Sequence, residues 1–402
     1  MKKSSFKNIK IEEFILGAIL FFLPISFGLN SVTIVLTFFY YLFKTIGNGS
    51  YKNLKAYYCS FSFFFAQLLS YFLSTNQQEA EIKLLLYSSF LVLPISFSYI
   101  AFKGVKLDKN KVFKFLFYGV VVMLTYGSIR FFYDVLFLNE RYDYGRAVAL
   151  LLKYIPHHAY MSMFILISIY AILVGQIDFG ENKKSIFFTP FLYLFLILLG
   201  SRMAILLGVF VLPVFLFKRL KGKKERKKFV LFGGVFSLII LIVGLSNDFV
   251  LDKIIYSYYD LLNIPTKEKP FLGVSYRQQV WYTVIDLIYQ SPFWGYGIGD
   301  VQEVLNNSYE ITDIKGLNAH NQYFQFILNY GIFICLVLFF LTFRVIKQCI
   351  INKQSILFFS WLILLFFCLS ESILNRQWGV VLFAFILNFS IYSQNKSLTT
   401  NE

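Results

Sequence analysis

The sequence predicts an all-α, polytopic integral membrane protein with about twelve transmembrane helices and one large loop on the outer face. Of its 402 residues, 57% are hydrophobic and 20% are aromatic, and the mean hydropathy is +0.63. This is far more apolar surface than the core of a soluble protein hides. The apolar residues are gathered in long windows, which predict membrane-spanning helices.

Apolar windows place the expected helices along the chain. The first ten residues are basic, but no small-residue cleavage site follows the apolar run from Phe14 to Phe27. We therefore expect a retained first span and a cytoplasmic N-terminus. The expected spans cover residues 13–29, 32–46, 57–74, 84–102, 112–133, 158–175, 186–200, 203–217, 229–245, 323–343, 356–370 and 378–392.

The distribution of Lys and Arg predicts which loops face the cytoplasm, because positive charge is retained on that side. One set of loops holds 25 of these residues, and the opposite set holds 11. The basic set comprises both termini and residues 44–56, 103–111, 176–185, 218–228 and 344–355. The other side then carries residues 134–157 and a loop over 246–322 with short helices. N-terminal helices over 1–245 precede that loop, and C-terminal helices with a cytoplasmic tail follow over 323–402.

The net charge of +16 lies mostly on the cytoplasmic side, above all in the run from Lys218 to Lys228. Beside two membrane spans, such a run fixes topology and attracts anionic headgroups, so we expect membrane lipids and no nucleic acid as its partner. The four cysteines lie in or beside apolar runs without the spacing of metal ligands. We therefore expect no disulfide framework, no metal and no cofactor.

The segment from Asn318 to Gly331 places one of only three histidines where a polar loop enters a long apolar run. Imidazole takes a proton from a hydroxyl near neutral pH more readily than most side chains, so His320 is a candidate general base. A histidine that merely caps a transmembrane helix at the membrane surface is the alternative.

Arg202 lies between two strongly apolar runs with no other charge nearby. An arginine within a bilayer costs roughly 2.5–3.5 kcal/mol, so it usually faces a polar cavity, a partner or a ligand. The alternative is an arginine that reaches the membrane surface from a short hairpin. One kinked helix over 186–217 is disfavoured, because it would place the basic run at 218–228 opposite the other basic loops.

The large loop contains a predicted helix followed by a glycine-rich turn. Apolar residues recur at helical spacing from Tyr276 to Gln290, and the segment from Ser291 to Asp300 then breaks the helix. The run from Gly295 to Gly299 superficially resembles a phosphate loop, but no strand precedes it. Its glycines instead predict a tight turn or close approach to a bulky ligand.

Two more polar clusters lie at predicted outer ends of helices. Glu371 and Arg376 share a short turn, where they form either a mutual ion pair or part of a site. His157 and His158 precede the sixth expected helix, and interfacial packing is favoured for them because a metal site lacks enough further ligands.

Arg202, Arg277 and His320 together place two fixed cations and one proton acceptor on the same side of the membrane. Guanidinium groups bind phosphate oxygens bidentately and stay charged, so a pair of them suits a pyrophosphate. The chain has no Asp-X-Asp motif for a metal-bound nucleotide sugar. A transferase here would stabilise its phosphate leaving group with arginine, which favours a lipid-linked donor.

The C-terminal half resembles the O-antigen ligase and polymerase superfamily. The N-terminal half matches only in hydropathy and in the approach of Pro156, His157 and His158 to a helix. The matching pieces are Leu199–Met203, Arg277 with Trp281, Ser291–Gly299, Ala319–Ile332 and the segment from Glu371 to Gly379.

The resemblance implies metal-independent transfer of a glycan from undecaprenyl pyrophosphate to a hydroxyl of lipid A-core or another glycan, at the periplasmic face of a bacterial inner membrane. Arg202 and Arg277 would bind the donor pyrophosphate, and His320 would act as general base in an inverting displacement. The substrate-binding candidates are Tyr276, Trp281, Trp294, Gly297, Asn321, Glu371 and Arg376. For the three aromatic residues in this set, packing against other aromatic side chains is an equally open alternative to substrate binding.

Three functions stay open from the sequence. A ligase is favoured, and a polymerase that extends lipid-linked repeat units is the second choice, because both need the same donor chemistry. A non-enzymatic transporter of lipid-linked glycans is the third. It would favour polar residues within several helix interiors, whereas here they concentrate at the outer ends.

Overall fold

The computed structural model describes residues 9–48, 50–137, 153–173, 188–208, 222, 274–309 and 315–398. Every regular element in these ranges is a helix, and none is a strand, which confirms the predicted all-α class. The elements are α1 (Ile11–Phe22), α2 (Phe27–Asn48), the 3-10 helix η2 (Ser50–Tyr57), α3 (Tyr58–Leu73), α4 (Gln77–Leu86), α5 (Ser89–Phe102), α6 (Lys109–Phe137), α8 (His158–Leu173), α9 (Phe188–Leu198), α10 (Arg202–Leu206), α14 (Val274–Gln290), α15 (Val301–Ser308), α16 (Gln322–Ile351), α17 (Ser355–Cys368), the 3-10 helix η6 (Ile373–Asn375) and α18 (Gln377–Leu398).

Five stretches of the described chain are helical, long and apolar enough to cross a membrane: Phe27–Asn48, Asn53–Leu73, Gln77–Phe102, Lys109–Phe137 and Gln322–Ile351. Helices α8, α9 and α17 are also apolar but shorter. The expected span at 229–245 and most of that at 203–217 lie outside the described residues. The full count of twelve spans therefore stays a prediction.

The first turn of the chain lies earlier than the sequence predicts. Helix α1 ends at Phe22 and α2 begins at Phe27, whereas a boundary between residues 29 and 32 is expected. Pro24 explains the difference, because its ring lacks an N–H and clashes with the preceding turn of a helix. Gly119 of α6 packs against this turn so closely that an added Cβ would collide with the Phe21 carbonyl oxygen.

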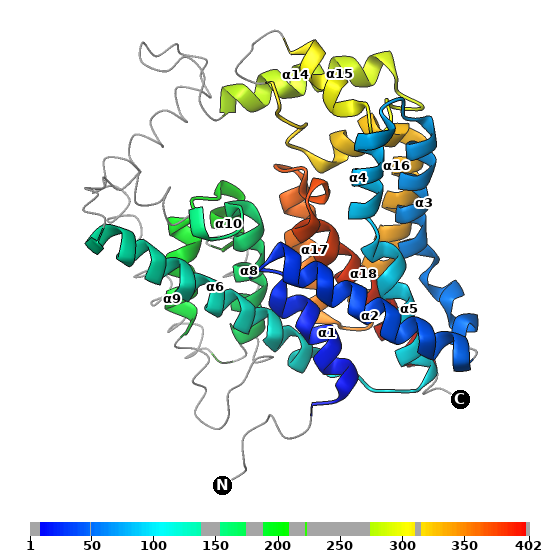
Figure 1. Cartoon of the computed structure of the whole chain (residues 1–402), viewed down its shortest axis with the longest axis vertical. Coiled ribbons are helices and arrows are strands. Elements are labelled where there is room, and N and C mark those ends of the chain that lie inside the picture. Colours follow the sequence, from blue (N-terminus) through cyan, green and yellow to red (C-terminus); the bar gives the residue numbers. More distant parts are fainter. Residues whose placement is uncertain are drawn as a thin grey trace.

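Helices α8 and α18 lie within the bundle (Figure 1). Helix α8 and residues 380–392 of α18 are mostly apolar and are buried on all faces. Such helices belong inside a protein or a membrane. The Tyr170 ring of α8 stacks on Phe359 of α17 with centroids 3.9 Å apart. Some of the few polar groups are paired across the bundle: Asn388 Nδ2 donates to Ser60 Oγ at 2.9 Å, and Trp361 Nε1 donates to Ser390 Oγ at 3.1 Å.

Basic loops that are distant in sequence meet at one end of the bundle. Lys10 Nζ donates to the Lys106 carbonyl oxygen at 2.6 Å, and Lys109 Nζ bonds to the Gln354 side chain. Glu13, buried in α1, accepts from the Asp108 N–H at 2.8 Å. The N-terminus and the loops near 103–111 and 352–354 therefore share one end, as expected for loops on the same side of a membrane.

Helices α14 and α15 form a layer across the opposite end, over the ends of α3, α4 and α16 (Figure 1). They have a small core of their own, in which Val280, Val284 and Leu287 pack with Val301 and Leu305. The layer is therefore a compact unit that covers the end of the bundle.

Asp300, at the end of the glycine-rich turn, attaches this layer to the junction of α3 and α4. Its carboxylate accepts from the Thr75 N–H and hydroxyl at 2.7 and 2.9 Å and from the Asn76 N–H at 2.7 Å. Burial raises the pKa of Asp300, but these three hydrogen bonds outweigh it and hold the pKa below its ordinary value. The charged carboxylate thus holds the turn that leads into α4, while the side chain of Asn76 caps the helix itself.

The glycines of the turn permit backbone contacts rather than an open phosphate loop. Gly295 has φ +68°, and a Cβ there would lie 2.5 Å from the Leu328 carbonyl oxygen. Gly331 has φ +76° and interrupts α16 at the point where the Ile332 N–H donates to the Pro292 carbonyl at 2.9 Å. Gly299 lies against the Asn76 carbonyl. The turn predicted from the sequence is therefore a docking segment.

Gly299→Ala is expected to destabilise the fold, because the added Cβ collides with the Asn76 carbonyl oxygen. Overpacking of this kind costs about 1–3 kcal/mol. Thermal unfolding of the detergent-purified protein measures the effect. Gly47→Ala is the control, since nothing lies within 4 Å of a Cβ at that helical position. Equal melting temperatures for the two variants would contradict the docking role of the turn.

Candidate functional site

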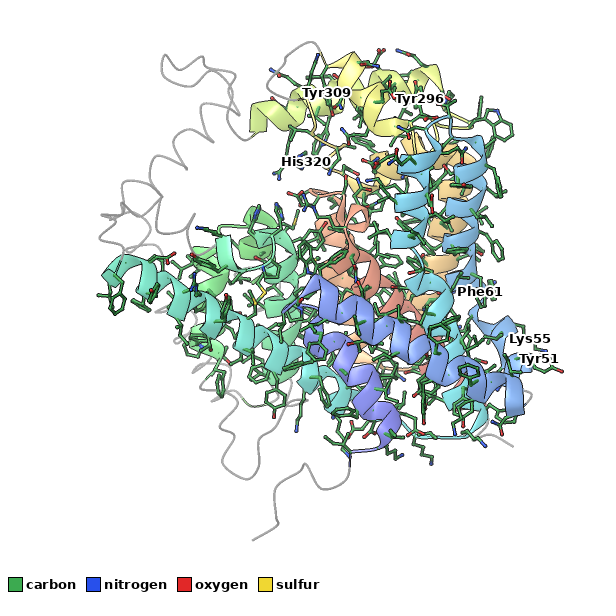
Figure 2. The ribbon with its side chains drawn as sticks, in the orientation of Figure 1. Tyr51, Lys55, Phe61, Tyr296, Tyr309 and His320 are labelled. Atoms are coloured by element: carbon green, nitrogen blue, oxygen red, sulfur yellow. The ribbon has the colours of Figure 1, made fainter. Side chains whose placement is uncertain are left out.

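Arg277, His320 and Glu371 meet at the α14–α15 end of the bundle. Arg277 Nη2 donates to Glu371 Oε1 at 2.8 Å, and His320 Nδ1 lies 3.1 Å from Glu371 Oε2. Figure 2 places His320 between the α14–α15 layer and the end of α17. The side chains of Arg277, His320 and Glu371 are 31%, 24% and 15% exposed. The cluster is therefore shielded from bulk water but open to a ligand.

His320 occupies a strained turn that other side chains hold in place. Its φ is +44°, a left-handed conformation that few residues other than glycine adopt. Asn318 Oδ1 accepts from the His320 N–H at 2.9 Å. Gln325 Oε1 accepts from the Ala319 N–H at 3.2 Å, and Trp281 Nε1 donates to the Ala319 carbonyl at 3.1 Å. Such strain persists where the surroundings over-determine it, often at functional sites.

The first residues of α16 tie the histidine turn to the loop that carries Glu371. Asn321 caps α16, with Oδ1 accepting from the Tyr323 N–H at 2.9 Å, while its Nδ2 donates to the Leu369 carbonyl at 3.2 Å. Gln322 Oε1 accepts from the Leu374 N–H at 2.7 Å. The predicted substrate-binding residue Asn321 thus holds two parts of the site together.

The charge state of Glu371 fixes the tautomer of His320. Burial raises the pKa of Glu371, but the hydrogen bond and charge of His320 and the charge of Arg277 outweigh it, so the pKa lies below its ordinary value of 4.5. The ionised carboxylate only accepts hydrogen bonds, so Nδ1 of His320 carries the proton of this contact. In the neutral ring Nε2 then holds the lone pair that can accept a proton.

Glu371 forms its described ion pairs with Arg277 and His320, while Arg376 is an exposed residue that follows η6. Of the two interpretations of the 371–376 turn, the geometry favours a place for Glu371 in the site. His157 is also within electrostatic reach: partial burial lowers its pKa, Glu371 opposes this effect, and Arg376 adds to it. The sequence alone assigns His157 and His158 to packing, and their rings do contact each other, with centroids 4.2 Å apart.

The chain reverses direction just before Arg202. Gly200 has φ +62°, and the Tyr193 hydroxyl donates to the Gly208 carbonyl at 3.3 Å. In one continuous helix these residues, 15 positions apart, would be separated by about 22 Å. This confirms the predicted hairpin over a single kinked helix. Arg202 begins α10, which contacts α8 and α17, and its side chain is outside the described part of the chain.

The other candidate residues divide between the site and the docking turn. Trp281 holds the histidine turn, as described above. Tyr276 lies one residue before Arg277 in α14, with its side chain outside the described part. Trp294 is 77% exposed beside Phe293, which stacks on Phe333 of α16 with centroids 5.4 Å apart. Gly297 packs against Ser74, and so belongs to the docking turn.

Within the described residues, no group of three or more His, Cys, Asp or Glu side chains could hold a metal ion. The polar groups that meet in the described cluster are one carboxylate, one imidazole and one guanidinium.

Apolar helices that carry a polar cluster beyond their ends define a helical membrane protein. Residues 187–341 match the family model described as O-antigen ligase, so this segment belongs to the O-antigen ligase superfamily, as its motifs predict. A search of curated proteins finds no match for the chain. The family implies a ligase or polymerase function of the glycosyltransferase type, with a lipid-linked glycan and a glycan acceptor as substrates, and fits a bacterial inner membrane.

The matched segment contains Arg202, Arg277 and His320 but ends before Glu371. The place of Glu371 in the site therefore comes from geometry and not from the family match. Arg277 and Glu371 are 94 positions apart in the sequence, and His320 and Glu371 are 51 positions apart. No local sequence pattern therefore predicts that these side chains meet.

Glu371→Gln is expected to change how stability depends on pH. Folding holds the pKa of Glu371 below 4.5, so its stabilising contribution is complete above pH 4.5 and is lost as the pH falls from that value through the lower pKa of the folded state. Below pH 4.5 the melting temperature of the natural protein should thus fall more steeply than that of the variant. Glu79→Gln, which removes an exposed carboxylate on α4, should follow the natural protein. Parallel curves for all three proteins would contradict the assignment.

Proposed function

We propose that this chain is a membrane glycosyltransferase of the O-antigen ligase type. It transfers a glycan from undecaprenyl pyrophosphate to a hydroxyl of lipid A-core, with inversion and without using a metal ion. The observation that carries the proposal is the Arg277–Glu371–His320 cluster, which joins a proton acceptor, the carboxylate that orients it and a permanent cation. The family match over residues 187–341 supports the same chemistry.

His320 acts as the general base in this proposal. Its Nδ1–H points to Glu371, so Nε2 accepts the proton of the acceptor hydroxyl as the oxygen attacks the anomeric carbon. The imidazolium that forms stays 3.1 Å from the Glu371 carboxylate, which stabilises the new positive charge. The bond between the anomeric carbon and the pyrophosphate oxygen breaks in the same displacement, and this inverts the configuration.

Arg277 and Arg202 bind the donor pyrophosphate in this proposal. A guanidinium has five N–H donors, and the contact with Glu371 uses Nη2 of Arg277, so the other nitrogens remain for phosphate oxygens. Arg202 comes from the hairpin beside α17, the helix that leads to the Glu371 loop. The two cations offset the charge that gathers on the pyrophosphate as it leaves.

The proposal places the α14–α15 end of the bundle in the periplasm, together with the predicted loop over 246–322. The basic loops around Lys10, Lys106 and Lys109 meet at the opposite end. Because positive charge is retained in the cytoplasm, that arrangement agrees with the predicted sidedness.

A polymerase uses the same donor and the same base, so its separation from a ligase depends on the acceptor. The surface glycan of a deletion strain distinguishes them. Loss of all polymer from lipid A-core indicates a ligase, and a single attached repeat unit indicates a polymerase.

Arg277→Lys and Arg202→Lys are expected to lose most transfer activity although the charge is kept. Lysine offers a point charge in place of the planar, two-pronged donor that binds a phosphate bidentately. Arg344→Lys, at the far end of α16, is the matched control and should be neutral. Transfer to lipid A-core in membranes with equal amounts of each variant gives the measurement. Near-normal transfer by both site variants would refute the pyrophosphate assignment.

His320→Ala is expected to abolish transfer while donor binding persists. General-base catalysis contributes typically about 10²–10⁴-fold, so we expect a loss in that range. The assay uses purified protein, a lipid-pyrophosphate donor and a chelator. His158→Ala is the control, because this residue begins α8 outside the cluster. A loss of less than about tenfold in His320→Ala, or transfer that requires added divalent metal, would overturn the mechanism.

A further inference from the structure

An exposed apolar surface continues from the membrane-spanning helix α16 onto the docking turn, Ser291–Asp300. After the break at Gly331, one face of α16 exposes apolar side chains at the helical spacing of three and four residues. These side chains, each more than half exposed, are Phe333, Leu336, Val337 and Phe340. Phe293 of the turn stacks on Phe333 with centroids 5.4 Å apart, and the next residue, Trp294, is 77% exposed. The exposed apolar face of α16 therefore continues onto the turn.

The composition of the turn is that of a membrane-contacting segment. From Gln290 to Gly299 the chain contains no charged residue. A contiguous apolar patch on a protein surface marks a site of contact with a membrane or another protein. Trp is the residue type that is enriched where hydrocarbon meets headgroups, because its ring is apolar while its Nε1–H can donate a hydrogen bond.

The position of Trp294 along α16 agrees with such a boundary. Its backbone packs against Gly331, where an added Cβ would lie 2.7 Å from the Trp294 nitrogen. From Gly331 to the exposed Lys347 near the other end of α16, the helix rises about 24 Å. The lysine side chain extends further toward the headgroups. The apolar face between these two residues thus matches a hydrocarbon core of roughly 30 Å.

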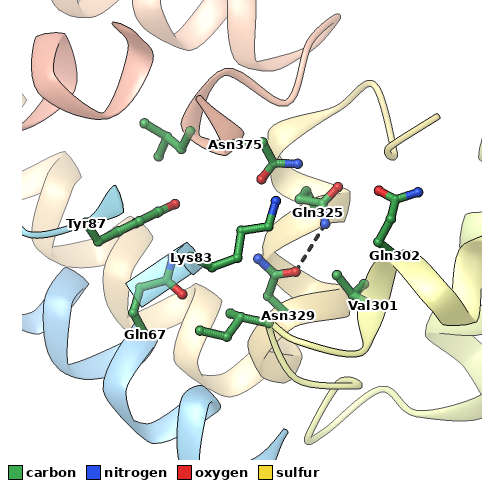
Figure 3. Close-up of a pocket in the computed structure, with 10 residues that line it drawn as sticks. Gln67, Lys83, Tyr87, Val301, Gln302, Gln325, Asn329 and Asn375 are labelled. Carbon is green, nitrogen blue, oxygen red and sulfur yellow. Dashed lines mark hydrogen bonds between the residues drawn. The ribbon is translucent and has the colours of Figure 1, made fainter. Parts of the chain in front are cut away.

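The inner side of the turn has polar neighbours. Ile298 and Val301 border a small polar gap beside Gln325 and Asn329 of α16 (Figure 3). Gln325 Nε2 donates to Asn329 Oδ1 at 3.1 Å. The turn therefore meets protein amides on one side and leaves an aromatic surface exposed on the other.

We propose that Phe293 and Trp294 form a membrane anchor, which holds the docking turn in the headgroup region of the bilayer at the α14–α15 end of the bundle. Lipid is the occupant because this uncharged surface continues the exposed face of a membrane helix and ends in a tryptophan. The inference does not depend on the proposed function. It assigns Trp294 to the membrane rather than to the glycan.

The anchor is connected to the candidate site through α14. The Tyr296 hydroxyl of the turn donates to the Leu287 carbonyl of α14 at 2.9 Å. Trp281 of the same helix donates to the strained turn that carries His320. The anchor therefore fixes the height of the candidate site relative to the lipid headgroups.

The test measures fluorescence quenching of Trp294 in the full chain, reconstituted in phosphatidylcholine nanodiscs. The chain has four tryptophans, so the emission of Trp294 is the difference between the natural protein and Trp294→Phe. Lipid brominated near the headgroup should remove most of this emission. Lipid brominated near the end of the acyl chain should remove less, and aqueous acrylamide should remove little.

Trp281→Phe is the matched control, because it isolates the emission of a tryptophan that donates to Ala319 within the protein. Brominated lipid should quench Trp281 far less than Trp294. Quenching of Trp294 by acrylamide without quenching by brominated lipid would show that the turn lies in water. Resistance to both quenchers would show that a protein surface, such as a second copy of the chain, covers it. Either result would overturn the inference.

Hydrogen–deuterium exchange of residues 291–299 in the same nanodiscs gives a second readout. Trp294→Ser should raise the exchange rate several-fold, because it removes the ring that the lipids hold, whereas Trp294→Phe should exchange as the natural protein does. A side chain that is 77% exposed has few protein contacts to lose, so unchanged exchange in the serine variant would contradict the anchor. Neither measurement involves a glycan, so its outcome is independent of the proposed transfer reaction.

Discussion

The carboxylate of Glu371 is the interaction on which the site depends. One of its oxygens accepts from Arg277 of α14 and the other faces His320 before α16, so a single charge positions a cation and a base that come from separate segments. With the carboxylate ionised, the histidine is restricted to one tautomer, and the nitrogen able to take a proton faces away from Glu371. In the proposed mechanism the same contact would stabilise the histidine after it takes a proton, because the imidazolium and carboxylate attract. The direction of that proton transfer and the stability of its product would then both depend on the charge of Glu371.

The Glu371 carboxylate can position Arg277 and His320 only because contacts elsewhere in the structure bring these two residues to it. Asn321 and Gln322 fasten the start of α16 to the loop of Glu371. Trp281 fastens α14 to the strained turn of His320. Helix α14 is in turn fixed by the docking segment, whose Asp300 binds the turn between α3 and α4. Small errors in the position of a catalytic group reduce catalysis strongly. Contacts remote from His320 would therefore matter for the proposed reaction, because they help to hold His320 in place.

The sequence predicts the groups of the site better than their pairing. His320 is conspicuous because titratable residues are scarce beside long apolar runs, and the helical class and the Gly200 hairpin follow from the same apolar pattern. Arg277 is indicated by its place at the start of a predicted helix in the large loop. The ion-pair partner of Glu371 does not follow from the sequence. Arg376 is only five residues away, yet Glu371 pairs with Arg277, 94 residues away, because the fold brings Arg277 to it. The glycine-rich turn is likewise predicted as a turn, but the surface it packs on belongs to α3, α4 and α16, which no local pattern indicates.

Charge balance explains why such a site would need more than one arginine. In the described cluster the positive charge of Arg277 already faces Glu371, so little net charge is left for a donor. A pyrophosphate beside a carboxylate is repelled unless a further cation offsets it. In the proposed mechanism the second cation is Arg202, the first residue of α10, which contacts α17 from a different part of the chain. A site arranged in this way can hold a negatively charged donor and still keep the carboxylate that orients its base.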